Sequence, residues 1–99
     1  MTTDERNAII AEALDVAGHF ELAWGFFPIP KPFHTSVDLT ITALNALGMA
    51  FSINQFEVSV WRRDTGNSWG EELSGHGPLA IAEALVVCAV EVLERAGAR

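Results

Sequence analysis

The sequence predicts an α+β fold in a single small domain, residues 1–99, with the order α-α-β-β-β-α and a three-stranded antiparallel sheet packed with helices. Three observations predict this class. Two polar helix starts precede apolar residues at helical spacing, a run of strand-forming residues fills the middle of the chain, and a strongly apolar helix follows near the end. A chain of 99 residues with 49% hydrophobic content is long enough to bury one core.

An N-terminal helix is expected over residues 4–17, within a segment of residues 1–18. Thr2 and Glu5 have the spacing of a capping box, in which a hydroxyl and a carboxylate satisfy unpaired amides of the first turn. Gly18 is a suitable stop, because the residue after a helix often takes a left-handed conformation that costs glycine little.

Residues 19–35 are expected to form an ordered, extended connection without helix. The stretch AWGFFPIPKPF contains three prolines, each of which removes a backbone donor and biases the residue before it towards extended geometry. Its aromatic side chains are expected to be packed rather than left wholly in water. With the apolar last helix, this connection exceeds what a monomer of this size easily hides, which favours a homodimer, although the oligomeric state stays open.

An α-βββ-α unit is expected over residues 36–96. It begins with a helix at 36–47, whose first turn carries a hydroxyl and a carboxylate. Strand composition follows, divided by a turn or bulge at residues 54–55. Residues 64–67 supply a tight hairpin connection, and 68–73 return antiparallel to the preceding strand.

The last helix is expected over residues 78–96, since Pro78 suits the first helical position. Its apolar residues cover an arc of roughly 200°, whereas a helix that buries one side shows a stripe of roughly 100° or more. We therefore expect this helix to touch the sheet on one flank and a second helix on the other.

Trp61 lies on the more polar side of its predicted strand. Alternation places three apolar residues on the other side: Phe56, Val58 and Val60. An exposed tryptophan beside Arg62 and Arg63 would suit a binding hot spot. We expect instead that the sheet is covered on both faces, with the first helix or the proline-rich connection lying over Trp61.

The negative net charge disfavours anionic partners and favours basic ones. Six basic residues against thirteen acidic ones give a formal charge of −7. This charge repels phosphate backbones and anionic lipids, so direct nucleic-acid binding is not expected, and it favours a host protein with a basic surface. No export signal or membrane-spanning run is found, and Cys88, the single cysteine, is interpreted as a small buried hydrophobe, so a cytoplasmic location is expected.

Residues 34–93 combine helix starts, tryptophans and a glycine-proline turn in this order: Ser36 and Asp38, Gly48, Trp61, Trp69, then GPLAI from residue 77. In this order they resemble a small family of bacteriophage domains described as an alpha-beta-alpha sandwich. The opening ERNAIIAEAL is similar to the start of short phage proteins that carry such domains. The family brings no established activity, so the resemblance implies a phage or prophage origin, with the infected bacterial host as the location, and no catalytic residue.

The α-βββ-α order is also similar to the double-stranded-RNA-binding fold, whose last helix follows a glycine-containing loop as this one follows residues 75–77. In that family lysines at the helix start contact phosphate. This sequence has LAIAE at residues 79–83 instead. The resemblance therefore extends to the topology and not to the ligand.

No motif with its own chemistry is found. His19, His34 and His76 have no paired ligand spacing, so no metal site is predicted. The loop at His76 and Gly77 resembles neither known phosphate-binding pattern, and helix initiation alone explains it. We therefore predict no catalytic residue and no cofactor, and a protein that is not an enzyme.

The leading hypothesis is a small acidic phage-derived binding protein that inhibits a host defence complex, in the manner of an anti-CRISPR, by occupying a basic surface. Its contact face would contain four residues: Asp64, Trp69, Glu71 and Glu72. The alternative is an oligomeric sponge that sequesters a signalling nucleotide through five residues: Trp61, Arg62, Arg63, His76 and Gly77. A third hypothesis is a structural or accessory phage protein.

Overall fold

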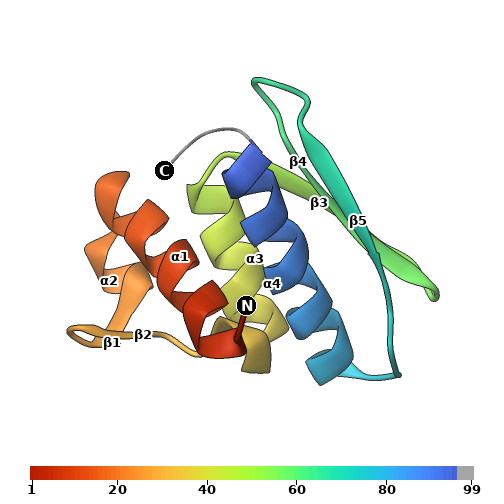
Figure 1. Cartoon of the computed structure of the whole chain (residues 1–99), viewed down its shortest axis with the longest axis horizontal. Helices are drawn as coiled ribbons and strands as arrows, with labels where there is room; N and C mark the ends of the chain where they lie inside the picture. The colour runs from red at the N-terminus through yellow and green to blue at the C-terminus, as the bar shows by residue number, and fades with distance from the viewer. Residues whose placement is uncertain (96–99) are drawn as a thin grey trace.

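This computed structural model describes residues 1–95, which form four α-helices, a three-stranded antiparallel sheet, a separate two-stranded hairpin and a 3₁₀ turn. The helices lie on one face of the sheet: α4 packs against the strands, α3 lies beside α4 and contacts one edge strand, and α1 packs against α4 (Figure 1). The α+β class and the three-stranded antiparallel sheet are as predicted. This arrangement, with the helices on one face of the sheet, differs from a sandwich with helices on both faces.

Helix α1 (Thr3–Val16) begins at the predicted capping box. The Glu5 amide donates to Thr2 Oγ1, and the Thr2 amide donates to Glu5 Oε1, both at 3.1 Å. The backbone hydrogen bond from Thr2 stabilises the charged carboxylate, so it lowers the pKa of Glu5 from its ordinary value. Ile10 and Leu14 on the inner side of α1 are buried in the core.

Residues 19–35 are not one extended connection. They form helix α2 (Phe20–Ala23), strands β1 (Trp24–Phe26) and β2 (Ile29–Pro30) of a small antiparallel hairpin, and the 3₁₀ turn η1 (Phe33–Thr35). The prediction that helix is excluded here is wrong for α2. The prolines begin only at Pro28, so every residue of that helical turn keeps its backbone donor.

Helix α3 (Val37–Ala46) begins at Ser36, whose Oγ accepts a hydrogen bond from the Leu39 amide at 3.2 Å. The buried hydroxyl of Thr40 donates to the carbonyl oxygens of Phe33 and Ser36. These hydrogen bonds join η1 to α3, so the position of Phe33 is tied to the helix.

The sheet has the order β3 (Met49–Ile53), β4 (Glu57–Arg62), β5 (Ser68–Glu72), and both pairs are antiparallel. Between β4 and β5, Gly66 adopts a φ of 75°, which a side chain would resist and which the tight connection requires. The predicted hairpin at residues 64–67 is confirmed.

Residues 54–55 form a turn, which is one of the two predicted alternatives. Asn54 Oδ1 accepts hydrogen bonds from the amides of Phe56 and Glu57, both at 2.8 Å. This side chain replaces backbone partners at the tip of the β3–β4 hairpin. Phe56 therefore belongs to the turn and is 71% exposed, so its predicted place beside the buried Val58 and Val60 is wrong.

Helix α4 (Pro78–Arg95) is enclosed on two flanks. It packs against β4 and β5 on one flank and against α1, α3 and η1 on the other. Val86, Val90 and Leu93 are exposed by only 1%, 2% and 3%. This confirms the prediction drawn from the wide apolar arc. The predicted end of the helix and of the α-βββ-α unit at residue 96 lies outside the described residues.

Candidate functional site

The two faces of the sheet differ in what covers them. Residues paired across antiparallel strands point to the same side, so the buried Val58 and Val60, which face α4, define the helix side. The other side carries small or polar residues and one aromatic: Ala50, Ser52, Glu57, Ser59, Trp61, Ser68, Gly70 and Glu72. We call this the open face, because no helix lies over it in Figure 1.

Trp61 lies on the open face, between Ala50 of β3 and Ser68 of β5. It is half-buried, because its strand neighbours cover part of the ring. The expectation that α1 or the proline-rich segment covers Trp61 is therefore wrong. α4 packs against β4 and β5 on the helix side and α3 contacts β3 there, and none of the described helices passes around the sheet edge to the open face.

Two carboxylates face each other at one end of the open face. Glu57 of β4 and Glu72 of β5 are direct cross-strand partners, and both are exposed. Within residues 1–95 neither side chain has a hydrogen bond or an ion pair. Like charges in this position repel and destabilise the strand pair. The pair is a local concentration of negative charge without a counterion from the described chain.

A depression of about 510 Å³ lies beside this pair. Glu57 and Glu72 line it together with Phe56 and with the loop that leads to α4, including His76. Gly77 follows with a φ of 97° and starts the helix, and its carbonyl accepts the amide of Ile81 at 3.3 Å. The surroundings of His76 and Gly77 are thus acidic, which suits a cationic group better than an anion.

The predicted contact residues do not share one face. Trp69 and Glu71 point to the helix side, where Trp69 Nε1 donates to Glu71 Oε2 at 3.0 Å and the Arg95 guanidinium lies 4.4 Å from the indole centroid. Glu72 points to the open face. Asp64 lies in the β4–β5 turn and pairs with Arg62 at 3.3 Å. Only Glu72 of the four belongs to the open face, because alternation separates it from its neighbour.

The residues of the nucleotide-sponge hypothesis fall at two ends of the sheet. Trp61, Arg62 and Arg63 stand at the end of β4, whereas His76 and Gly77 lie near its beginning at Glu57. Six residues of extended strand separate these ends by roughly 16 Å. A single chain therefore does not bring the five residues together.

Cys88 is wholly buried, as predicted, and its thiol donates to the Val58 carbonyl at 3.7 Å. Burial raises the pKa of Cys88 to about 12, and the negative charges of Glu71, Glu57 and Glu91 contribute to the shift. Among residues 1–95, no cluster of three or more histidines, cysteines and carboxylates is placed to hold a metal ion. In the same range, no helix has the length and apolar content needed to span a membrane.

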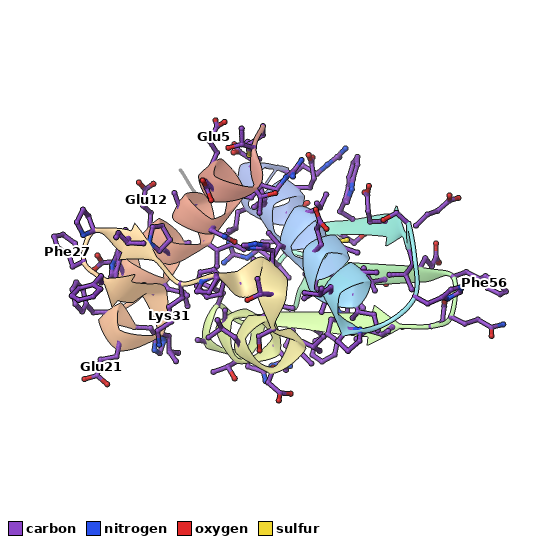
Figure 2. All side chains as sticks on the ribbon, turned by 90° about the horizontal axis from the view of Figure 1, so that it is seen from below. Glu5, Glu12, Glu21, Phe27, Lys31 and Phe56 are labelled. Atoms are coloured by element: carbon purple, nitrogen blue, oxygen red, sulfur yellow. The ribbon has the colours of Figure 1, made fainter. Side chains whose placement is uncertain are left out.

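Exposed aromatic side chains gather at the other end of the molecule, where the sequence predicts packed ones (Figure 2). The aromatic hairpin, residues 20–30, exposes four large apolar side chains: Phe20 by 49%, Phe26 by 81%, Phe27 by 65% and Ile29 by 62%. Phe33 is wholly buried and Trp24 half-buried, so the expectation that the aromatics of this segment pack is correct for these two alone. The run WGFFPIP could have indicated this exposure, because its glycine and prolines predict a turn at the surface while none of its other side chains is charged.

A groove of about 550 Å³ lies between the ends of α1, α3 and α4. Its apolar walls come from four residues, Ile9, Ala13, Leu47 and Leu93, and Arg62 also lines it.

Comparisons of this chain with protein-family models, with curated proteins and with solved structures find no match.

Proposed function

We propose that this chain is a small, non-enzymatic binding protein that acts by occupying a basic surface of a host protein. The observation that carries the proposal is the Glu57–Glu72 pair on the open face of the sheet. The two carboxylates repel each other in the free protein, and a lysine or arginine of a partner placed between them would relieve that repulsion. Binding a partner's cation would thus remove the unfavourable repulsion between Glu57 and Glu72, and this gain would add to the affinity.

The surroundings of the pair suit a protein partner. Ser59 and Gly70 are the next cross-strand pair on the open face, and their small size leaves room for a flat surface to approach. Trp61 lies further along the same face and supplies an aromatic contact of the kind enriched at binding hot spots. An acidic end, a small-residue centre and an aromatic end together fit a basic surface with an apolar neighbour.

The origin and target of the proposed inhibitor rest on the resemblance of residues 34–93 to phage domains. A phage protein of charge −7 that binds a basic surface is suited to block a nucleic-acid channel in a host defence complex, such as a CRISPR effector. The infected bacterial cytoplasm is the location that follows. The acidic open face replaces the predicted set of Asp64, Trp69, Glu71 and Glu72 as the contact face of this proposal, with Glu72 common to both.

The double charge reversal Glu57→Lys, Glu72→Lys tests the face. Immobilised wild-type protein is expected to retain a basic nucleic-acid-binding protein from bacterial lysate, and the reversal is expected to lower its retention at least about tenfold, because complementary charges become like charges. Glu12→Lys, Glu83→Lys changes the net charge equally at two exposed positions away from the open face and should retain the partner. Equal losses with both variants would show that only net charge matters and would remove the proposed face.

A stability measurement tests the pair independently of any partner. Glu72→Gln is expected to raise the free energy of unfolding by about 0.2–1 kcal/mol, or the melting temperature by about 1–6 °C, since it removes the repulsion with Glu57. Urea and thermal denaturation followed by circular dichroism would measure it. Glu83→Gln is the matched control, because it makes the same change of charge on an exposed turn of α4. A gain no larger than that of the control would show that the pair is not strained.

A further inference from the structure

The aromatic hairpin is an apolar surface without a partner in the described chain. Between Glu21 and Lys31 the sequence contains no charged residue. The hairpin forms one end of the molecule, with Phe27 at its tip, whereas Phe56 marks the opposite end beside the acidic depression (Figure 2). Whatever binds the hairpin therefore leaves the open face free.

Internal contacts hold the hairpin in one conformation. The indole of Trp24 donates from Nε1 to Asp15 Oδ2 of α1 at 3.0 Å, and the amide of Lys31 donates to the Ala23 carbonyl at 3.0 Å. The ring of Phe27 lies 5.4 Å from that of Trp24 and 5.5 Å from that of Phe20. A surface ordered in advance loses little conformational entropy on binding, so its apolar area is available for affinity.

The exposed area matches what a symmetric pair requires. At the exposed fractions of its four large side chains, the hairpin presents roughly 500 Å² of apolar surface. Two copies that bury this surface against each other would remove about 1,000 Å² from water, which is the lower limit of a specific interface. Interfaces between identical subunits are more apolar than those of transient complexes, and an uncharged hairpin would form an interface of this apolar kind.

We propose that the aromatic hairpin is the interface of a homodimer, in which the hairpins of two copies pack together about a twofold axis. This proposal goes beyond the binding function proposed above and does not depend on it. The open faces of the two copies would stay clear of the dimer interface, because the helices lie between the hairpin and the three-stranded sheet in each copy (Figure 1). Such a dimer binds two basic sites on one assembly with greater avidity than a monomer.

Sedimentation equilibrium of the full chain tests the interface without any partner. We expect a reversible dimer with a dissociation constant of about 10–100 μM, and we expect Phe26→Ser to weaken it at least about tenfold. Phe26 is the most exposed aromatic of the hairpin and is outside its ring contacts, so the substitution leaves the fold intact. Phe56→Ser is the matched control at the opposite end and is expected to leave the dissociation constant unchanged.

Two further measurements distinguish the interface from other uses of the hairpin. Raising the salt from about 0.05 to 0.5 M should strengthen the dimer, because it screens repulsion between two copies of charge −7. Flotation with phosphatidylcholine vesicles should leave the protein unbound. A wild-type protein that stays monomeric up to about 1 mM, a dimer that survives Phe26→Ser, or vesicle binding by a monomer would each overturn the proposal.

Discussion

Replacing Phe33 with alanine is expected to lower the free energy of unfolding by about 3–5 kcal/mol, a large part of the stability of a domain of this size. Phe33 is the largest wholly buried side chain, and its turn η1 packs against α4. The removed ring leaves a cavity that the surrounding helices can fill only in part, because Thr40 and the backbone of η1 stay joined by hydrogen bonds. Urea denaturation followed by circular dichroism measures the loss.

Phe56→Ala is the matched control for this experiment. The same atoms are removed, but Phe56 is 71% exposed at the tip of the β3–β4 turn. Its free energy of unfolding is expected to stay within about 0.5 kcal/mol of the wild type. Similar losses in the two variants, or a loss below about 1 kcal/mol for Phe33→Ala, would contradict the placement of Phe33 in the core.

The thiol of Cys88 is expected to react with DTNB at least about a thousandfold more slowly in the native protein than in urea at about pH 8. The thiolate is the reactive form, and burial raises the thiol pKa from 9.0 to about 12. The side chain is also wholly buried between α4 and β4. Reaction should therefore follow opening of the structure, so its rate should rise as urea lowers the stability. Fast labelling in native buffer would contradict this.

The same pKa shift predicts the alkaline limit of stability. The folded state favours the neutral thiol, so the contribution of Cys88 is fully present below the unfolded pKa of 9.0 and is lost as the pH rises towards about 12. Between these values the free energy of unfolding is expected to fall more steeply in the wild type than in Cys88→Ala. Parallel pH dependences of the two proteins would show that the thiol stays neutral in both states or is not shielded.

The position of α4 explains why these two predictions have large effects. Phe33 lies on the flank of α4 that faces the other helices, and Cys88 contacts the sheet on the opposite flank. A substitution on either flank disturbs α4, which contacts both the sheet and the other helices. The surfaces proposed for binding lie outside this core, at the two ends of the molecule, so they tolerate substitution.

The sequence by itself determined the local elements. The capping box of Thr2 and Glu5, the Ser36 cap and the turn glycine Gly66 act through neighbours a few residues away, so spacing alone predicts them. The sequence also predicted that α4 is enclosed on two flanks, because its apolar arc is wider than the stripe that packing against one neighbour would bury. Together with the strand composition of the middle segment, these features predict the α+β class and the turn between β4 and β5, but not which residues pair across the strands.

Only the tertiary structure decided which surfaces stay open. Phe27 and Phe33 belong to the same proline-rich run, yet one is 65% exposed and the other is wholly buried, because only η1 reaches the space beneath α4. Likewise, strand pairing rather than sequence proximity joins Glu72 to Glu57 and separates it from Glu71. Burial and cross-strand pairing depend on segments far apart in the chain, and a single sequence specifies them only through the completed packing.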